Sequence, residues 1–106
     1  MPKVVWFSKL QPGVEPEVYE DWVRRVDYPG AKNVPSLLSY KVYRIQGPCV
    51  ESEISFDYDY VEIAEVTDMD DYLRDLDEHP AALEIIAEID QYVRSVGSAW
   101  GFPVEE

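Results

Sequence analysis

The sequence has few of the cross-linking residues that stabilise many small proteins independently of their hydrophobic core. It contains a single cysteine, Cys49, in 106 residues, so no internal disulfide can form. A lone thiol is typical of reducing compartments, and we therefore expect a cytoplasmic protein. No apolar stretch reaches membrane-spanning length, and no basic start followed by an apolar run precedes Val4. Insertion into a membrane is therefore not expected.

Residue patterns for metals and cofactors are also missing. His79 is the only histidine, and with Cys49 it cannot complete a closed zinc site. Asp57 and Asp59 have calcium-loop spacing, but Glu62 stands where that loop needs a glycine. There is no GxGxxG motif, no phosphate-binding glycine loop with a lysine, and no GxSxG motif. We therefore expect no cofactor and no metal.

Positive charge is scarce. Nine lysine and arginine residues stand against 22 aspartate and glutamate residues, giving a formal net charge of −13. Such a chain repels phosphate groups, so nucleic acids and anionic membranes are not expected as partners. The acidic run between residues 68 and 78 lacks metal-ligand spacing and is expected to be a solvated helix face.

The composition is that of one globular domain. Hydrophobic residues make up 46% and charged residues 29% of the chain, which is typical of folded proteins. The length suits a single core, so we expect one domain over residues 1–106.

Hydrophobic periodicity and turn residues divide the chain into strands and helices. The first helix is expected to end at Tyr28-Pro29-Gly30, the second to be capped by Thr67, and the third to end at Gly97. A parity change near Tyr60 indicates a bulge, a bend or a change of partner in the third strand. The expected strands are 3–10, 36–46, 50–66 and 98–104, and the helices begin near Pro16, Thr67 and Pro80.

The resulting order, β-α-β-β-α-α-β, predicts a ferredoxin-like α+β fold with a four-stranded antiparallel sheet. Helices would cover one face of that sheet. The first three strands carry apolar residues on both faces, so a monomer would expose a large apolar surface. We therefore predict a homodimer whose two sheets face each other.

Two polar residues interrupt apolar strand faces. Arg44 shares a face with Tyr40, and Glu62 shares one with Tyr60. If their strands form a hairpin, Arg44 and Glu62 would meet in a cavity walled by both tyrosines and a tryptophan. The alternative is a structural ion pair at the sheet edge.

Two further residues have competing interpretations. Asp27 lies in the expected last turn of the first helix, where a carboxylate opposes the helix dipole at a cost of about 0.3–1 kcal/mol. Its neighbours Trp22, Arg24 and Tyr28 would hold it as a base or acceptor, or else it caps a turn. His79 stands at a helix junction, where an exposed or capping role is commoner than catalysis.

Four short motifs rich in aromatic and charged residues follow one another along the chain. They are Tyr19-x-x-Trp22-Val23-Arg24-x-x-Asp27-Tyr28-Pro29, Ser39-Tyr40-x-Val42-Tyr43-Arg44, Tyr58-Asp59-Tyr60-Val61-Glu62 and Val66-Thr67-Asp68. Through them the chain resembles the REDY-like family, in particular its HapK type, over nearly its whole length. The resemblance implies a dimeric α/β barrel and a role in pathways for prodigiosin-type tripyrrole pigments and related indole products. Some members are thought to act in cyclisation or condensation, and others as accessory proteins.

Residues and resemblance together predict a protein of a prodigiosin-type pathway, on its bipyrrole branch, that binds a flat heteroaromatic intermediate. As an enzyme it would assist cyclisation, condensation or dehydration by cofactor-free proton transfer, with Asp27 or Glu62 as base and Arg44 or Tyr60 steadying an oxygen. The remaining ligand-binding candidates are Trp6, Trp22, Arg24, Tyr28 and Tyr40. The alternatives are a non-catalytic carrier or chaperone for an intermediate or enzyme and, by analogy of fold alone, a cofactor-independent oxygenase.

Overall fold

The computed structural model describes all residues of the chain from 1 to 106. A π-helical segment, η1, and a short helix, α2, continue the first helix. None of the helices is long and apolar enough to cross a membrane. The elements are β1 Lys3–Leu10, α1 Pro16–Trp22, η1 Val23–Asp27, α2 Tyr28–Ala31, β2 Leu37–Arg44, β3 Tyr60–Val66, α3 Met69–Glu78, α4 Pro80–Ile89 and β4 Val93–Gly101.

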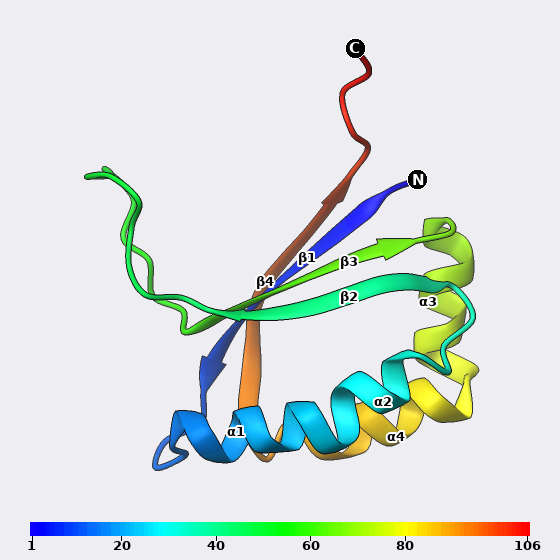
Figure 1. The fold of residues 1–106 in the computed structure, drawn as a ribbon, viewed down its shortest axis with the longest axis horizontal. Helices are drawn as coiled ribbons and strands as arrows, with labels where there is room; N and C mark the ends of the chain where they lie inside the picture. Colours follow the sequence, from blue (N-terminus) through cyan, green and yellow to red (C-terminus); the bar gives the residue numbers. More distant parts are fainter.

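The four strands form one antiparallel sheet in the order β2-β3-β1-β4. β1 and β3 are therefore central, while β2 and β4 are the edges. Figure 1 shows all helices on one side of the sheet, so its other face is bare in a single chain. This is the ferredoxin-like arrangement, and the predicted α+β fold is confirmed.

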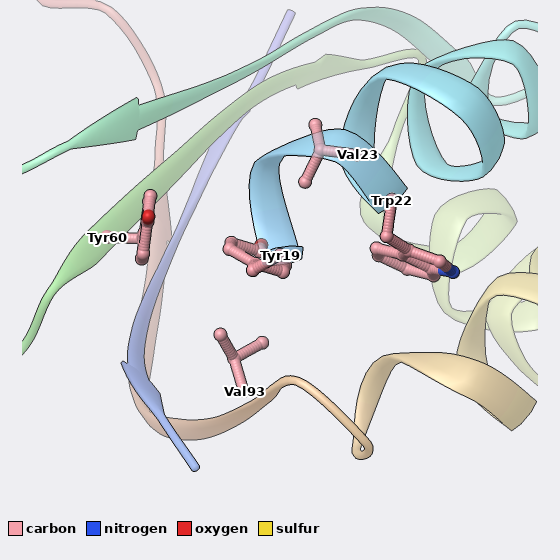
Figure 2. Packing of buried hydrophobic residues seen from close by; sticks show 5 residues of the cluster. All are labelled: Tyr19, Trp22, Val23, Tyr60 and Val93. Atoms are coloured by element: carbon pink, nitrogen blue, oxygen red, sulfur yellow. The ribbon is translucent and has the colours of Figure 1, made fainter. Parts of the chain in front are cut away.

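The core lies between the sheet and the helices, in two groups of buried side chains. The first group is Tyr19, Trp22, Val23, Tyr60 and Val93 (Figure 2), and the second is Val4, Ala64, Val66 and Tyr72. In Figure 2 the Tyr19 ring lies between Tyr60 and Trp22. Tyr19 packs edge-on against Tyr60, with ring centroids 4.8 Å apart. Each such ring buries about 150–250 Å², so these contacts anchor α1 to the sheet.

The first helix does not end at the proline, as the sequence predicted. It continues through the π turn η1 into α2, and the Tyr28 N–H donates to the Val23 carbonyl in the wider i→i−5 pattern. A proline ring normally collides with the carbonyl four residues earlier. Here that carbonyl belongs to Arg25 inside the wider turn, and Pro29 stands at the start of α2, where a missing N–H costs little. Asp27 therefore lies within a continuous helical stretch.

The third strand is shorter than predicted. It begins at Tyr60, and residues 50–59 belong to an arm that projects from the end of the sheet (Figure 1). The Asp59 carboxylate ties the base of this arm to β1 by accepting a hydrogen bond from the Leu10 N–H at 2.8 Å. Lys9 and Asp57 form an ion pair beside it, with Nζ and Oδ1 2.6 Å apart. The parity change near Tyr60 marks the point where the chain enters the sheet.

The last predicted helix is too long. α4 ends at Ile89 rather than Gly97, and the last strand, expected at 98–104, begins earlier, because residues 93–97 also belong to β4. Val93 pairs with Leu10, and the Tyr92 carbonyl accepts a hydrogen bond from the Gln11 N–H at 2.9 Å. The apolar spacing is compatible with a helix, but pairing with β1 decides for a strand, to which β-branched valines are suited.

The N-cap of α3 is Asp68 rather than the predicted Thr67. The Asp68 carboxylate accepts a hydrogen bond from the Asp71 N–H at 2.7 Å, which satisfies one of the free N–H groups of the first turn. Thr67 is held through its backbone, whose N–H donates to the Ser36 carbonyl at 2.9 Å. Its Oγ1 is buried without a hydrogen-bond partner.

We expect Asp68→Ala to lower the free energy of unfolding by about 1 kcal/mol, because the cap hydrogen bond is lost. Thr67→Val keeps the side-chain shape and removes a hydroxyl that has no partner, so stability should stay unchanged or rise. Urea unfolding followed by circular dichroism measures both variants. A greater loss in Thr67→Val than in Asp68→Ala would contradict this assignment of the cap.

Candidate functional site

The cavity that is lined by the buried polar residues Ser8, Asp27 and Glu62, named the main cavity, lies between the sheet and the helices and has a volume of about 220 Å³. Most of its lining is apolar and comes from α2, α3, α4 and the helix-facing side of the sheet. Three lining residues, Ile86, Asp90 and Ser95, are exposed, so the cavity opens beside the end of α4. The aromatic and polar residues further inside are Trp6, Ser8, Asp27, Tyr40, Glu62 and Tyr72.

Glu62 reaches this cavity from the central strand β3. It lies opposite Trp6 of β1 and is only 6% exposed. The Ser8 and Tyr19 hydroxyls donate hydrogen bonds to its Oε1, at 3.1 and 3.2 Å. Burial, followed by the nearby Asp27 carboxylate, raises the pKa of Glu62 to about 7, although the two hydroxyl donors counteract part of the rise. Glu62 can therefore gain or lose a proton near neutral pH.

Asp27 enters the same cavity from the π turn and is 2% exposed. The Tyr40 hydroxyl donates to its Oδ2 at 2.8 Å. Burial raises the pKa of Asp27 to about 6, and the hydrogen bond from Tyr40 offsets part of that rise. The predicted unfavourable interaction between the Asp27 carboxylate and the end of a helix dipole does not occur, because the helix continues beyond Asp27. Its unusual feature is burial, at a π turn of the kind often found at functional sites.

The hydroxyl groups around the two carboxylates are fixed donors. Burial raises the pKa of Tyr19 and of Tyr40 far above the ordinary tyrosine value, so both stay protonated. The Trp6 indole N–H, from the strand beside Glu62, donates to the Tyr72 hydroxyl of α3 at 3.1 Å. The polar atoms at the cavity are thus held in place by hydrogen bonds between different elements.

Two carboxyl groups with pKa values of about 6 and 7 suit acid–base chemistry near neutral pH. Glu62 can hold a proton while Asp27 is ionised, so one group can donate and the other accept. No group of three or more histidine, cysteine, aspartate or glutamate side chains is placed to hold a metal ion. The arrangement is that of a proton-transfer or ligand-binding site.

Arg44 and Glu62 share one face of the sheet, as predicted, but they do not pair. Arg44 lies opposite Tyr60, and its guanidinium binds Glu20 of α1, with Nε and Oε2 2.6 Å apart. Tyr60 donates to the same oxygen at 2.6 Å, and Arg24 lies 3.8 Å from the other oxygen of Glu20. Glu20 takes the partner role expected for Glu62, because α1 carries it over this end of the hairpin. The two arginines and Tyr60 border a separate pocket of about 110 Å³.

Three other candidates have structural roles. Trp22 is packed in the aromatic core and does not line the main cavity. The Tyr28 hydroxyl accepts a hydrogen bond from the Val42 N–H at 3.1 Å, which ties the helix to the edge strand β2. His79 caps α4, since its Nδ1 accepts from the Ala81 N–H at 3.1 Å. The capping interpretation of His79 is therefore confirmed.

The predicted candidates that the cavity brings together are Trp6, Asp27, Tyr40 and Glu62. The sequence analysis did not identify the hydroxyls of Ser8 and Tyr19, which bind Glu62, or Tyr72, which lines the cavity. Ser8 was accessible from the alternation of β1, because it shares the parity of Trp6. No local signal separates Tyr19 or Tyr72 from an ordinary core tyrosine.

The chain matches a family model described as REDY-like protein HapK over residues 2–104. Among solved structures, HapK from Hahella chejuensis is similar over 100% of this chain and 95% of that one, with a TM-score of 0.82 and 21% identity. No curated protein matches the chain in sequence.

Two further solved structures have the same fold. SnoaB, a cofactor-independent oxygenase from Streptomyces nogalater, has a TM-score of 0.71 and 18% identity, with 99% of this chain and 94% of that chain covered. A dimeric ferredoxin-like protein of unknown function from Thermobifida fusca has a TM-score of 0.65 and 16% identity, with coverages of 94% and 86%. At such identities these similarities establish the fold alone.

The raised pKa values of Asp27 and Glu62 determine how stability should vary with pH. In the unfolded chain both carboxyl groups lose their protons near pH 4, whereas the folded chain holds them to about pH 6 and 7. Between these limits the folded state binds more protons, so the free energy of unfolding falls as pH rises. The loss is on the order of 3 kcal/mol for each group.

Urea unfolding at pH 5 and pH 8 tests this expectation. The unmodified chain should be less stable at pH 8, and the double variant Asp27→Asn/Glu62→Gln should show a much smaller difference. Asp75→Asn is the control, because the hydrogen bond from Ser36 lowers the pKa of Asp75 and moves its titration below this range. Stability that rises from pH 5 to pH 8 in the unmodified chain would contradict the burial of the pair.

Proposed function

Since the chain belongs to the family of REDY-like HapK proteins, we propose that it is a small biosynthetic protein that binds a flat heteroaromatic intermediate in its main cavity. The family resemblance points to prodigiosin-type pathways, so a bipyrrole is the proposed ligand. The observation that carries the proposal is the pair of buried carboxyl groups, Asp27 and Glu62, in one cavity with aromatic walls.

The size and lining of the cavity suit a flat ligand of one or two rings. Its volume of about 220 Å³ is below the about 300–1,000 Å³ of pockets for drug-sized molecules. Trp6 and Tyr40 offer ring faces and edges, and Ile85 and Ile89 of α4 supply an apolar wall. A pyrrole-type N–H would find a carboxylate acceptor at Asp27 or Glu62.

In the proposed reaction the two carboxyl groups divide the work of proton transfer. The ionised carboxylate removes a proton from carbon or nitrogen, and the protonated carboxyl gives its proton to a departing hydroxyl group. Ring closure or dehydration then releases water without a cofactor, and the two groups exchange protonation states. Ser8 and Tyr19 hold Glu62 in position throughout. The proposed step does not use Arg44 or Tyr60, because neither lines the main cavity and both bind Glu20.

Turnover of a bipyrrole precursor by the purified protein is the direct test. Asp27→Asn and Glu62→Gln should each lower the rate by roughly tenfold to ten-thousandfold, as removal of a general acid or base does, while the chain still folds. Asp21→Asn removes the same charge from the outer face of α1, where its side chain is 58% exposed, and should leave the rate unchanged.

The same experiment separates the alternatives. Binding of the precursor without turnover would favour a carrier, a role also suited to carboxylates held fixed by hydroxyl donors. Oxygen consumption would favour an oxygenase, the activity given for SnoaB, which has this fold. Full turnover in both carboxyl variants would remove the pair from the reaction.

We further propose that two chains pair through the open face of the sheet. Val5 and Phe7 of β1 and Val61 and Ile63 of β3 lie on this face, half-buried in one chain. A contiguous apolar face of this kind is usually covered in solution. The Thermobifida fusca protein with this fold is described as dimeric, which supports the same arrangement here.

Static light scattering should give the mass of a dimer that changes little with salt, because the contact is apolar. Ile63→Lys places a charge in the contact and should produce monomers. Leu83→Lys is the control, since Leu83 is 42% exposed on α4, away from the sheet face, and should keep the dimer. A stable monomer of the unmodified chain at micromolar concentration would refute the pairing.

A further inference from the structure

The main cavity has acidic groups and no basic one. Asp27 and Glu62 face its interior and Asp90 lies at its opening, but no lysine, arginine or histidine lines it. Burial of a carboxylate without a cation is costly, and hydroxyl donors compensate for only part of that cost. The protein thus supplies two buried acceptors and leaves their charge without an ionic partner.

Each buried carboxylate also keeps one oxygen free of hydrogen bonds from the protein. Ser8 and Tyr19 both donate to Oε1 of Glu62, and Tyr40 donates to Oδ2 of Asp27. Both acidic side chains are more than nine-tenths buried, at 6% and 2% exposure, and both line the cavity. Glu62 Oε2 and Asp27 Oδ1 are therefore the acceptors that remain for N–H groups of a ligand.

Basic side chains of the first helix and of the edge strand β2 make their contacts outside the main cavity. Arg44 and Arg24 both contact Glu20, outside the main cavity. Lys41 lies over the Tyr28 ring, with Nζ 5.4 Å from the ring centroid. None of them is placed to neutralise a ligand carboxylate or phosphate inside the cavity.

Aromatic rings add a second preference for positive charge. Trp6, Tyr40 and Tyr72 line the cavity, and the faces of such rings attract cations. This attraction strengthens where the cation and the ring are desolvated.

We infer that the cavity selects planar ligands that carry or develop a positive charge and present N–H donors to Asp27 and Glu62, and that it rejects ligands bearing a carboxylate or phosphate. The inference rests on the proposed function and specifies its substrate class. In the proton-transfer reaction, the same charge pattern would stabilise a cationic ring intermediate relative to its neutral precursor.

A matched series of monosubstituted benzenes tests the inference without knowledge of the natural ligand. Benzamidine, benzamide and benzoate have the same ring and a planar three-atom substituent, with charges of about +1, 0 and −1 at neutral pH. Calorimetric titration at pH 8 should rank their affinities in that order, with roughly tenfold or more between benzamidine and benzamide. The indole N–H resonance of Trp6, assigned with Trp6→Phe, should shift on binding.

Variants show whether the buried pair is the cause. Asp27→Asn and Glu62→Gln should each weaken benzamidine binding roughly tenfold or more and change benzamide binding little. Glu84→Gln removes one charge from the exposed side of α4, outside the cavity lining, and should leave all three affinities unchanged. An equal weakening in Glu84→Gln would assign the effect to net charge and overturn the inference.

The outcomes distinguish the inference from the proposed function. If the three compounds bind in the cavity with equal affinity, or benzoate binds most tightly, the charge preference is wrong while the aromatic site stands. If none of them shifts the Trp6 resonance, both the aromatic site and its charge preference are refuted.

Discussion

The structure depends on keeping two carboxyl groups buried without a cation beside them. Hydroxyl donors from three elements meet this demand: Ser8 on β1 and Tyr19 on α1 for Glu62, and Tyr40 on β2 for Asp27. Ser8 and Tyr19 are buried and Tyr40 is half-buried, and desolvation raises the pKa of both tyrosine hydroxyls so that they stay protonated. The site is therefore a network between elements, and it exists only when the sheet and the first helix are in place.

The π turn lets two acidic residues of the first helix reach different parts of the structure. Glu20 and Asp27 are seven positions apart, a spacing that puts two side chains on nearly the same face of a regular α-helix. The wider turn η1 lies between them and changes this relation. Glu20 binds Arg44 and Tyr60 at the end of the hairpin, while Asp27 enters the cavity. The arginines are thereby held apart from the buried carboxyl pair.

Much of the site was accessible from strand alternation. Period-two spacing put Arg44 on one face with Tyr40 and Glu62 on one face with Tyr60, and the register of β2 and β3 brings these residues to the same side of the sheet. The partner of Arg44 was not accessible, because a long guanidinium reaches several neighbours and the nearest carboxylate comes from α1. Strand alternation determines on which face of the sheet Arg44 lies, whereas the helix packed on that face determines which carboxylate Arg44 binds.

The sequence by itself determined the element order and the apolar faces of the strands, since these follow from residue type and spacing. Only the tertiary structure decided that residues 93–97 are a strand, because pairing with β1 outweighs an ambiguous apolar pattern. It likewise decided that the helix passes Pro29 through a wide turn. The protonation of Asp27 and Glu62 was settled at the same level, because their pKa values are raised by burial, and burial is a property of packed neighbours rather than of the residues themselves.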